Sequence, residues 1–197
     1  MANVELSAAE MELMCNASVI LTKNSIIEKV NRLFVNLSIQ YQQNEIGKKI
    51  VEELQSSFPK ISKGEKYEGL PWMMLDYPRS FTAADVFAVR TFFWWGNFFS
   101  ITLQLKGKYK NKFQVSSNKL QEKEGWYLCC NVDEWQHHFR EDNYKPLSSF
   151  SEKEIAALSF IKLAKKIPLH KWDDAENMLK NSFEELMNAL MKYKSAT

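Results

Sequence analysis

The sequence predicts an α+β fold in which a small antiparallel sheet of about four strands is packed by amino-terminal and carboxy-terminal α-helices. Apolar residues recur at helical spacing near both ends of the chain, whereas the middle is rich in aromatic and β-branched residues. In that middle part, Gly96-Asn97 separates two apolar runs, which is typical of a two-residue β-hairpin turn. The expected strands lie near 70–76, 87–95, 98–106 and 126–131.

The composition indicates a folded protein with little overall charge. Hydrophobic residues make up 45% of the 197 residues and aromatic residues 13%, which is enough for a well-packed core. The formal net charge is +2, so no global field favours nucleic acid or an anionic membrane. The longest apolar run, 91–105, is interrupted by polar residues and is shorter than the about 20 residues that a membrane helix needs. We therefore expect no nucleic-acid partner and no membrane association.

The amino terminus and the cysteines favour a cytoplasmic protein. Residues 1–13 contain acids where a secretory signal would have a basic region and an apolar run, so we expect no targeting segment. The three cysteines, Cys15, Cys129 and Cys130, are odd in number and two are adjacent, which suits a reducing compartment better than a disulfide framework.

The chain is expected to form one domain, 1–197, with three regions. Residues 1–58 form a helical amino-terminal layer, 67–132 hold the sheet, and 151–194 form a carboxy-terminal helical pair. Between the first two regions, the polar and glycine-containing segment 60–68 is predicted to be a short linker.

The first region has the strongest helical periodicity. Ser7 and Glu10 have the spacing of a capping box, which predicts a short helix that ends near Cys15. A longer helix is expected to begin at Asn24, or as early as Val19. Its apolar stripe consists of Ile26, Val30, Leu33, Phe34, Leu37 and Tyr41. The phase changes near 44–47, where a third helix begins, and Pro59 ends that helix.

The central hairpin competes with a helical alternative. Thr82 and Asp85 have capping-box spacing and would open a helix. Against this, Ile101, Leu103 and Leu105 alternate with polar residues, as in a strand with one wet face. We therefore predict two strands, preceded at most by one helical turn over 83–86.

The remaining segments are assigned from weaker signals. Residues 108–122 fit either a helix or a strand, and their charged, serine-rich end favours a helix. A helical turn is expected over 133–140 and a loop over 143–150. Two capping boxes then predict the closing helices: Ser151 with Glu154, before a helix that Pro168 ends, and Asp173 with Glu176.

Two scarce arginines suggest a binding site. Arginine occurs four times in the chain, and Arg90 would share a strand face with Phe92 and Trp94, where its guanidinium is partly desolvated. It then needs a carboxylate, an aromatic face or a bound anion. Asp76 and Asp85 are the internal alternatives, and an acidic ligand beneath the tryptophans is the functional one. The candidate ligand-binding residues are Trp72, Arg79, Arg90, Trp94 and Trp95.

A second cluster suggests metal binding or acid–base chemistry. If 133–140 is helical, Asp133 with His137 and Glu134 with His138 are i, i+4 pairs, in which a carboxylate and an imidazole could share a metal ion. The pattern is not HExxH, and an exposed polar turn is the favoured alternative. The neighbouring Cys129 would need a histidine as base to be a nucleophile, so a buried thiol is favoured.

These residues support three alternative functions. The preferred one is a non-catalytic module that binds a small acidic ligand or a protein partner through the aromatic, arginine-containing sheet face. The first alternative is an enzyme that uses the Asp133, Glu134, His137 and His138 cluster with a metal ion or as acid and base. The second is a structural protein whose aromatic residues form a homodimer interface. No catalytic residues and no cofactor are assigned, because nucleotide-binding loops, GxSxG and CxxC motifs are missing from the sequence.

Overall fold

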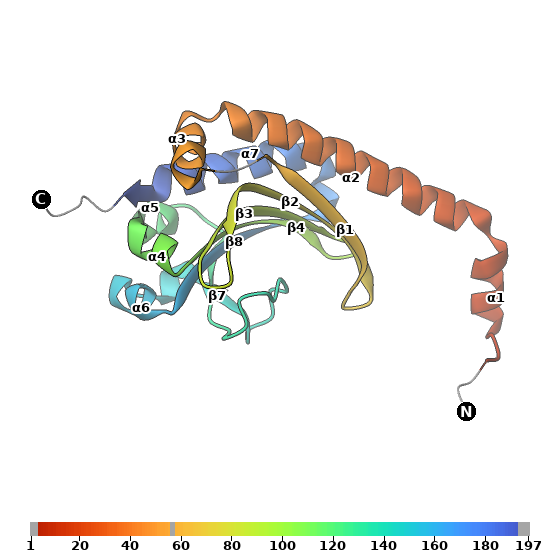
Figure 1. The fold of residues 1–197 in the computed structure, drawn as a ribbon. Helices are drawn as coiled ribbons and strands as arrows, with labels where there is room; N and C mark the ends of the chain where they lie inside the picture. Colours follow the sequence, from red (N-terminus) through yellow and green to blue (C-terminus); the bar gives the residue numbers. More distant parts are fainter. Residues whose placement is uncertain (1–3, 56–57, 193–197) are drawn as a thin grey trace, which may run out of the picture.

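Residues 4–55 and 58–192 are described by the computed structural model, which has an α+β architecture (Figure 1). Its helices are α1 (Ala8–Cys15), α2 (Ala17–Gln43), α3 (Glu45–Leu54), α4 (Lys108–Lys112), α5 (Ser117–Gln121), α6 (Glu152–Ala157) and α7 (Trp172–Ala189), with 3-10 turns η1 (Leu147–Ser149) and η2 (Leu169–Lys171). Its strands are β1 (Lys60–Tyr67), β2 (Leu70–Phe81), β3 (Val86–Trp94), β4 (Phe98–Lys106), β5 (Phe113–Val115), β6 (Trp126–Cys129), β7 (Tyr144–Pro146), β8 (Phe160–Pro168) and β9 (Leu190–Lys192).

One antiparallel sheet of seven strands forms the centre of the fold, with the order β1-β2-β3-β4-β8-β6-β7. The short strands β5 and β9 pair separately. Helices α2 and α7 lie side by side on one face of the large sheet, where the rings of Tyr41 and Phe183 stack at 3.9 Å (Figure 1). The sheet is therefore larger than the four strands expected from the sequence.

Helix α2 confirms the predicted amphipathic stripe. Its buried residues include Val30, Phe34 and Leu37, which belong to the main core under the sheet. The helix begins at Ala17, earlier than Asn24, and Asn44 ends it and caps α3 by accepting the Gly47 amide at 2.9 Å. Helix α1 has no buried residue and extends beyond the sheet (Figure 1).

The predicted hairpin of β3 and β4 is confirmed, but its turn is longer by one residue. Trp94 pairs with Phe98, so the turn comprises Trp95, Gly96 and Asn97. Gly96 has φ +70°, a left-handed conformation that glycine adopts without strain. The predicted helical turn over 83–86 does not form. Instead, 82–85 is a tight connection in which the Thr82 N–H donates to Asp85 O and the Asp85 N–H donates to Thr82 Oγ1, each at 2.9 Å, and Val86 begins β3.

Strand β8 replaces most of a predicted helix. The Ser151 capping box is present, but α6 ends at Ala157 and β8 occupies 160–168. In β8, Ile161 and Leu163 point into the core while Lys162 lies on the opposite face, so the period is two rather than 3.6. The helix prediction up to Pro168 was wrong because both periods fit these few apolar positions.

The segment 60–68 is also a strand and not the predicted linker. Strand β1 pairs with β2 at the edge of the sheet, with a register shift between Gly64 and Tyr67. Lysine and glycine are typical of an edge strand, since exposed charges discourage pairing with another chain.

The other weak assignments were corrected in part. Segment 108–122 contains α4 and α5, as favoured, but also the three-residue strand β5. Residues 133–140 form a turn and an extended loop instead of a helical turn, and 144–146 is strand β7 rather than loop. The last helix is present as α7, although its N-cap is Lys171 and not Asp173. Residues 1–3 and 56–57 of the predicted amino-terminal layer, and 193–194 of the predicted carboxy-terminal pair, lie outside the described residues.

Within the described ranges, none of the helices combines the length and the hydropathy that crossing a bilayer requires.

Gly64 permits close packing between β1 and β2. A Cβ atom at this position would lie 2.6–2.8 Å from the indole of Trp72. We expect Gly64→Ala to displace Trp72 and to lower the free energy of unfolding by about 1–3 kcal/mol in urea denaturation. Gly47→Ala is the control, because the nearest atoms there lie at 3.5 Å and alanine favours a helix. Equal stability of the two variants would contradict this packing.

Candidate ligand-binding face

The sheet face opposite α2 and α7 is covered by the segment 130–143, which connects β6 to β7 and which we call the cover loop (Figure 1). Alternate residues of the strands point toward this loop, and we call this side of the sheet the cover-loop face. Its side chains include Trp72, Met74 and Asp76 of β2, Arg90, Phe92 and Trp94 of β3, Phe98 and Gln104 of β4, and Lys162 of β8.

Polar contacts attach the cover loop to the sheet. The hydroxyl of Tyr67 accepts the backbone N–H groups of His137 (2.8 Å) and His138 (3.1 Å). The Nζ of Lys162 donates to the backbone oxygens of Glu134 (2.8 Å) and Gln136. The backbone of the loop therefore provides hydrogen-bond partners for polar side chains of the sheet, which would otherwise have to be hydrogen-bonded by water.

Arg90 is neutralised inside the protein. Its Nε donates to Asp76 Oδ1 at 2.7 Å, and both side chains are buried. The guanidinium also lies 5.2 Å from the ring centroids of Phe81 and Trp135. The structure thus selects Asp76 from the two internal partners considered for Arg90, and Asp85 instead accepts the backbone N–H of Lys108.

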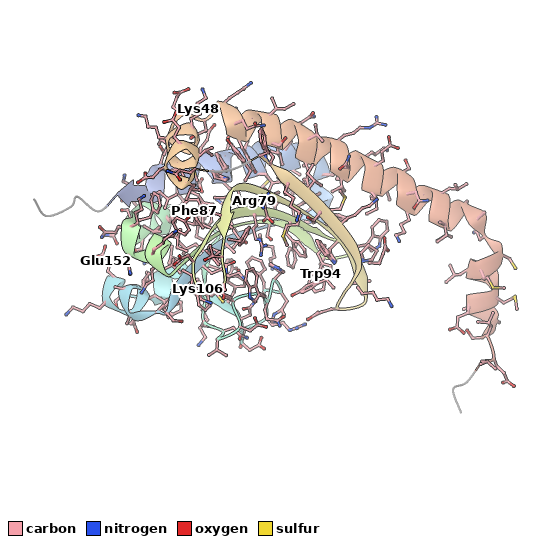
Figure 2. All side chains as sticks on the ribbon, viewed as in Figure 1. Lys48, Arg79, Phe87, Trp94, Lys106 and Glu152 are labelled. Atoms are coloured by element: carbon pink, nitrogen blue, oxygen red, sulfur yellow. The ribbon has the colours of Figure 1, made fainter. Side chains whose placement is uncertain are left out.

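A carboxylate of the cover loop is held at the far end of β4. Glu134 is buried, and its oxygens accept from Gln104 Nε2 at 2.8 Å and from Lys106 Nζ. Figure 2 marks Lys106 and Trp94, which lie at opposite ends of the β3–β4 pair. Glu134 therefore binds at the end remote from the hairpin turn.

Lys162 is a second buried cation of this face and lies opposite Gln104 in the sheet. Its exposed fraction is 0%, and burial lowers its pKa to about 8. Burial, together with Lys162 and Arg90, also holds the pKa of His137 well below its ordinary range, so this imidazole is neutral at pH 7. Its ring stacks on Phe92 with centroids 4.9 Å apart.

A groove of about 430 Å³ lies at the other end of the β3–β4 pair, beside the hairpin turn. Aromatic rings form its wall, with Phe98 in edge-to-face contact with both Trp94 (5.5 Å) and Phe139 (5.1 Å). Lys166 lies at its rim, 5.5 Å from the Phe139 ring centroid. The lining residue His138 is 4% exposed, and in the described part of the chain its Nδ1 has no hydrogen-bond partner.

The structure separates the five predicted ligand-binding residues. Trp72, Arg90 and Trp94 lie on the cover-loop face, and Arg79 lies in β2 opposite Ala88. Trp95 packs on the helix-covered side, 6.3 Å from Phe93. Trp94 lines the groove, whereas Arg90 lies deeper under Trp135.

The predicted metal cluster is also spread along the cover loop. Asp133 accepts the backbone N–H of Trp135 at 2.9 Å, whereas Glu134 binds Gln104, His137 stacks on Phe92, and His138 lines the groove. The predicted i, i+4 arrangement does not form, because the loop is not helical. Over residues 4–55 and 58–192, no group of three or more His, Cys, Asp or Glu side chains is placed to hold a metal ion.

Cys129 is a buried thiol. It donates to Asn143 Oδ1 at 3.3 Å, and burial raises its pKa. A thiol of raised pKa is a weak nucleophile at neutral pH, which supports the favoured interpretation of this residue.

Comparison with protein-family models, with curated proteins and with solved structures gives no match to this chain.

Several residues of this face were missed in the sequence. Lys162 and Lys166 were not recognised as residues of a sheet face, because 151–168 was predicted to be a helix. Gln104 was predicted to lie on the solvent-exposed face of its strand. The alternation of Ile161, Leu163 and Ile167 was a signal for a strand, and it would have placed both lysines on one face.

Proposed function

We propose that the protein is a non-catalytic binding module that takes up a small acidic ligand in the groove beside the hairpin turn. The observation that carries the proposal is the buried imidazole of His138, whose Nδ1 lacks a partner among the described residues and which lines a groove with aromatic walls. A buried polar atom without a partner is unfavourable, and a bound ligand would satisfy it.

The chemistry of the groove favours an acid with an apolar part. The rings of Trp94, Phe98 and Phe139 offer an apolar surface, and Lys166 supplies positive charge at the rim, where Arg140 is paired with Glu68. Burial lowers the pKa of His138, as does the nearby Arg140, so the imidazole is neutral and able to donate one hydrogen bond. Small-molecule sites typically combine apolar walls with a few polar groups of this kind.

Binding of arylacetic and alkylacetic acids, measured by isothermal titration calorimetry, tests the proposal. We expect the Lys166→Glu variant to bind the best of these acids about tenfold more weakly than the wild type, because the rim loses its attractive charge and gains a repulsive one. Lys145→Glu is the matched control, since it makes the same change of charge on the exposed strand β7, outside the groove.

Two results would contradict this assignment. Equal affinities of the two lysine variants would show that the acid does not bind at the rim of the groove. Absence of binding by the wild-type protein at roughly 1 mM of every acid would contradict a small acidic ligand altogether. The cytoplasmic location stays a prediction. The homodimer also stays a prediction, and three of the aromatic residues, Phe34, Phe87 and Phe99, are buried in the core and are not on the surface where a dimer would form.

A further inference from the structure

The contact between Glu134 and β4 has the form of a carboxylate-binding site. Gln104 Nε2 donates to one oxygen of Glu134 at 2.8 Å, and Lys106 Nζ donates to the other. Gln104 is fully buried, and its Oε1 has no hydrogen-bond partner in the part of the chain that the structure describes. An amide that donates to a carboxylate while its own oxygen is unpaired can accept one more donor.

Near Glu134, the cover loop is attached to the sheet in part by polar groups that water or a ligand can replace. The loop has no helix or strand between Cys130 and Asn143, and Val132 and Trp135 beside Glu134 are 97% and 45% exposed. The polar contacts at this point are those to Gln104, Lys106 and Lys162, and Trp135 also lies over the Arg90 guanidinium. Segments with few buried apolar contacts open at lower free energy than the strands to which they are attached.

The local charges favour an anion at this position. Arg90, Lys106 and Lys162 lie on the cover-loop face, and Asp76 and Glu134 are the carboxylates paired there. If Glu134 moves out, three cations face one carboxylate, and two of them, Arg90 and Lys162, are buried. A buried cation without a counterion is unfavourable, so another anion would be attracted.

We propose that Glu134 is an internal substitute for a ligand carboxylate, and that a small hydroxycarboxylate binds Gln104 and Lys106 when Glu134 moves away. The carboxylate of the ligand accepts from Gln104 Nε2 and Lys106 Nζ, and its hydroxyl donates to Gln104 Oε1. The site lies at the opposite end of the β3–β4 pair from the groove, so it does not depend on the function proposed for the groove.

Rescue of a Glu134→Ala variant by added lactate tests this proposal. The variant is expected to unfold at a lower temperature than the wild type, and lactate is expected to raise that temperature in proportion to the logarithm of its concentration. Propionate, which lacks the hydroxyl, should be several-fold less effective, and propionamide, which lacks the charge, should have no effect. Glu141→Ala is the matched control, because it removes the same side chain from an exposed position of the same loop.

The comparison of variants decides the outcome. Equal shifts with lactate in Glu134→Ala, Glu141→Ala and the wild type would overturn the proposal, because they would reflect a general effect of the salt. If Glu134→Ala does not fold, Glu134→Gln replaces it, because glutamine keeps the shape of the side chain. The broadening of the lactate NMR signal should then be at least tenfold stronger with Glu134→Gln than with the wild type. Lack of broadening would equally overturn the proposal. Neither result depends on Lys166, so failure here leaves the groove unaffected.

Discussion

Replacing Arg90 with methionine is expected to lower the free energy of unfolding by about 3–5 kcal/mol, because Asp76 is then left buried without its partner. The two side chains are 9% and 6% exposed and are joined by the 2.7 Å bond from Nε to Oδ1. The variant also loses the contacts of the guanidinium with Phe81 and Trp135. Urea denaturation at neutral pH measures the difference.

A double variant separates the pair from its components. Asp76→Leu combined with Arg90→Met removes both charges, and we expect it to recover most of the lost stability, since apolar residues of similar volume replace buried ion pairs well. Arg140→Met is the matched control: Arg140 pairs with Glu68 at the surface, and such pairs contribute about 0–1 kcal/mol. If Arg90→Met costs no more than Arg140→Met, the pair is not desolvated and the cover loop does not shield it.

The local signals in the sequence were sufficient for the central part of the sheet. Strand β4 has the predicted bounds, 98–106, and β3 differs from its predicted bounds by one residue at each end. Alternation and a glycine at the turn determine both strands locally. The number of strands was underestimated because β1 is a polar edge strand and β7 is only three residues long.

Strand β8 shows where local reasoning fails. Its capping box at Ser151 is real, but it starts a helix of only six residues. The pairing of β8 with β4 and β6, which are distant in sequence, determines its conformation. The local pattern of this segment fits a helix and a strand, and the tertiary pairing decides between them.

The candidate site was predictable in residue types but not in arrangement. The period of a strand predicted that Arg90 and Trp94 share one face, and the structure confirms it. The sequence also indicated that Arg90 requires a buried partner, and in the structure this partner is the carboxylate of Asp76. The cover loop was not predicted, because 133–140 was expected to be helical. His138 and Glu134 were selected as metal ligands, whereas the structure places His138 in the groove beside the hairpin turn and Glu134 against Gln104, toward the other end of β4.

Lys162 is expected to make the stability of the protein increase with pH in the alkaline range. Its pKa in the folded protein is about 8, below the ordinary lysine value of 10.5, because burial disfavours the charged form. Between these two pH values the unfolded chain holds a proton that the folded chain has released, so the free energy of unfolding rises with pH. From pH 7 to about pH 9.5 this contribution amounts to about 2 kcal/mol.

The comparison of wild type with Lys162→Met measures this contribution, because the buried thiol and tyrosines that titrate nearby are present in both proteins. The variant also loses the lysine charge that lowers the pKa of Cys129, and this loss acts in the same direction. Burial raises the pKa of Cys129 and of Tyr144, and these groups lower stability as pH rises. Urea denaturation at several pH values should therefore show the wild type gaining about 2 kcal/mol relative to Lys162→Met, whereas Lys145→Met, at an exposed position, should show no such difference. If the free energy of unfolding depends on pH in the same way in the wild type and in Lys162→Met, the ammonium group of Lys162 is hydrated in the folded protein. Its hydrogen bonds to the backbone of Glu134 and Gln136 would then not exclude water from it.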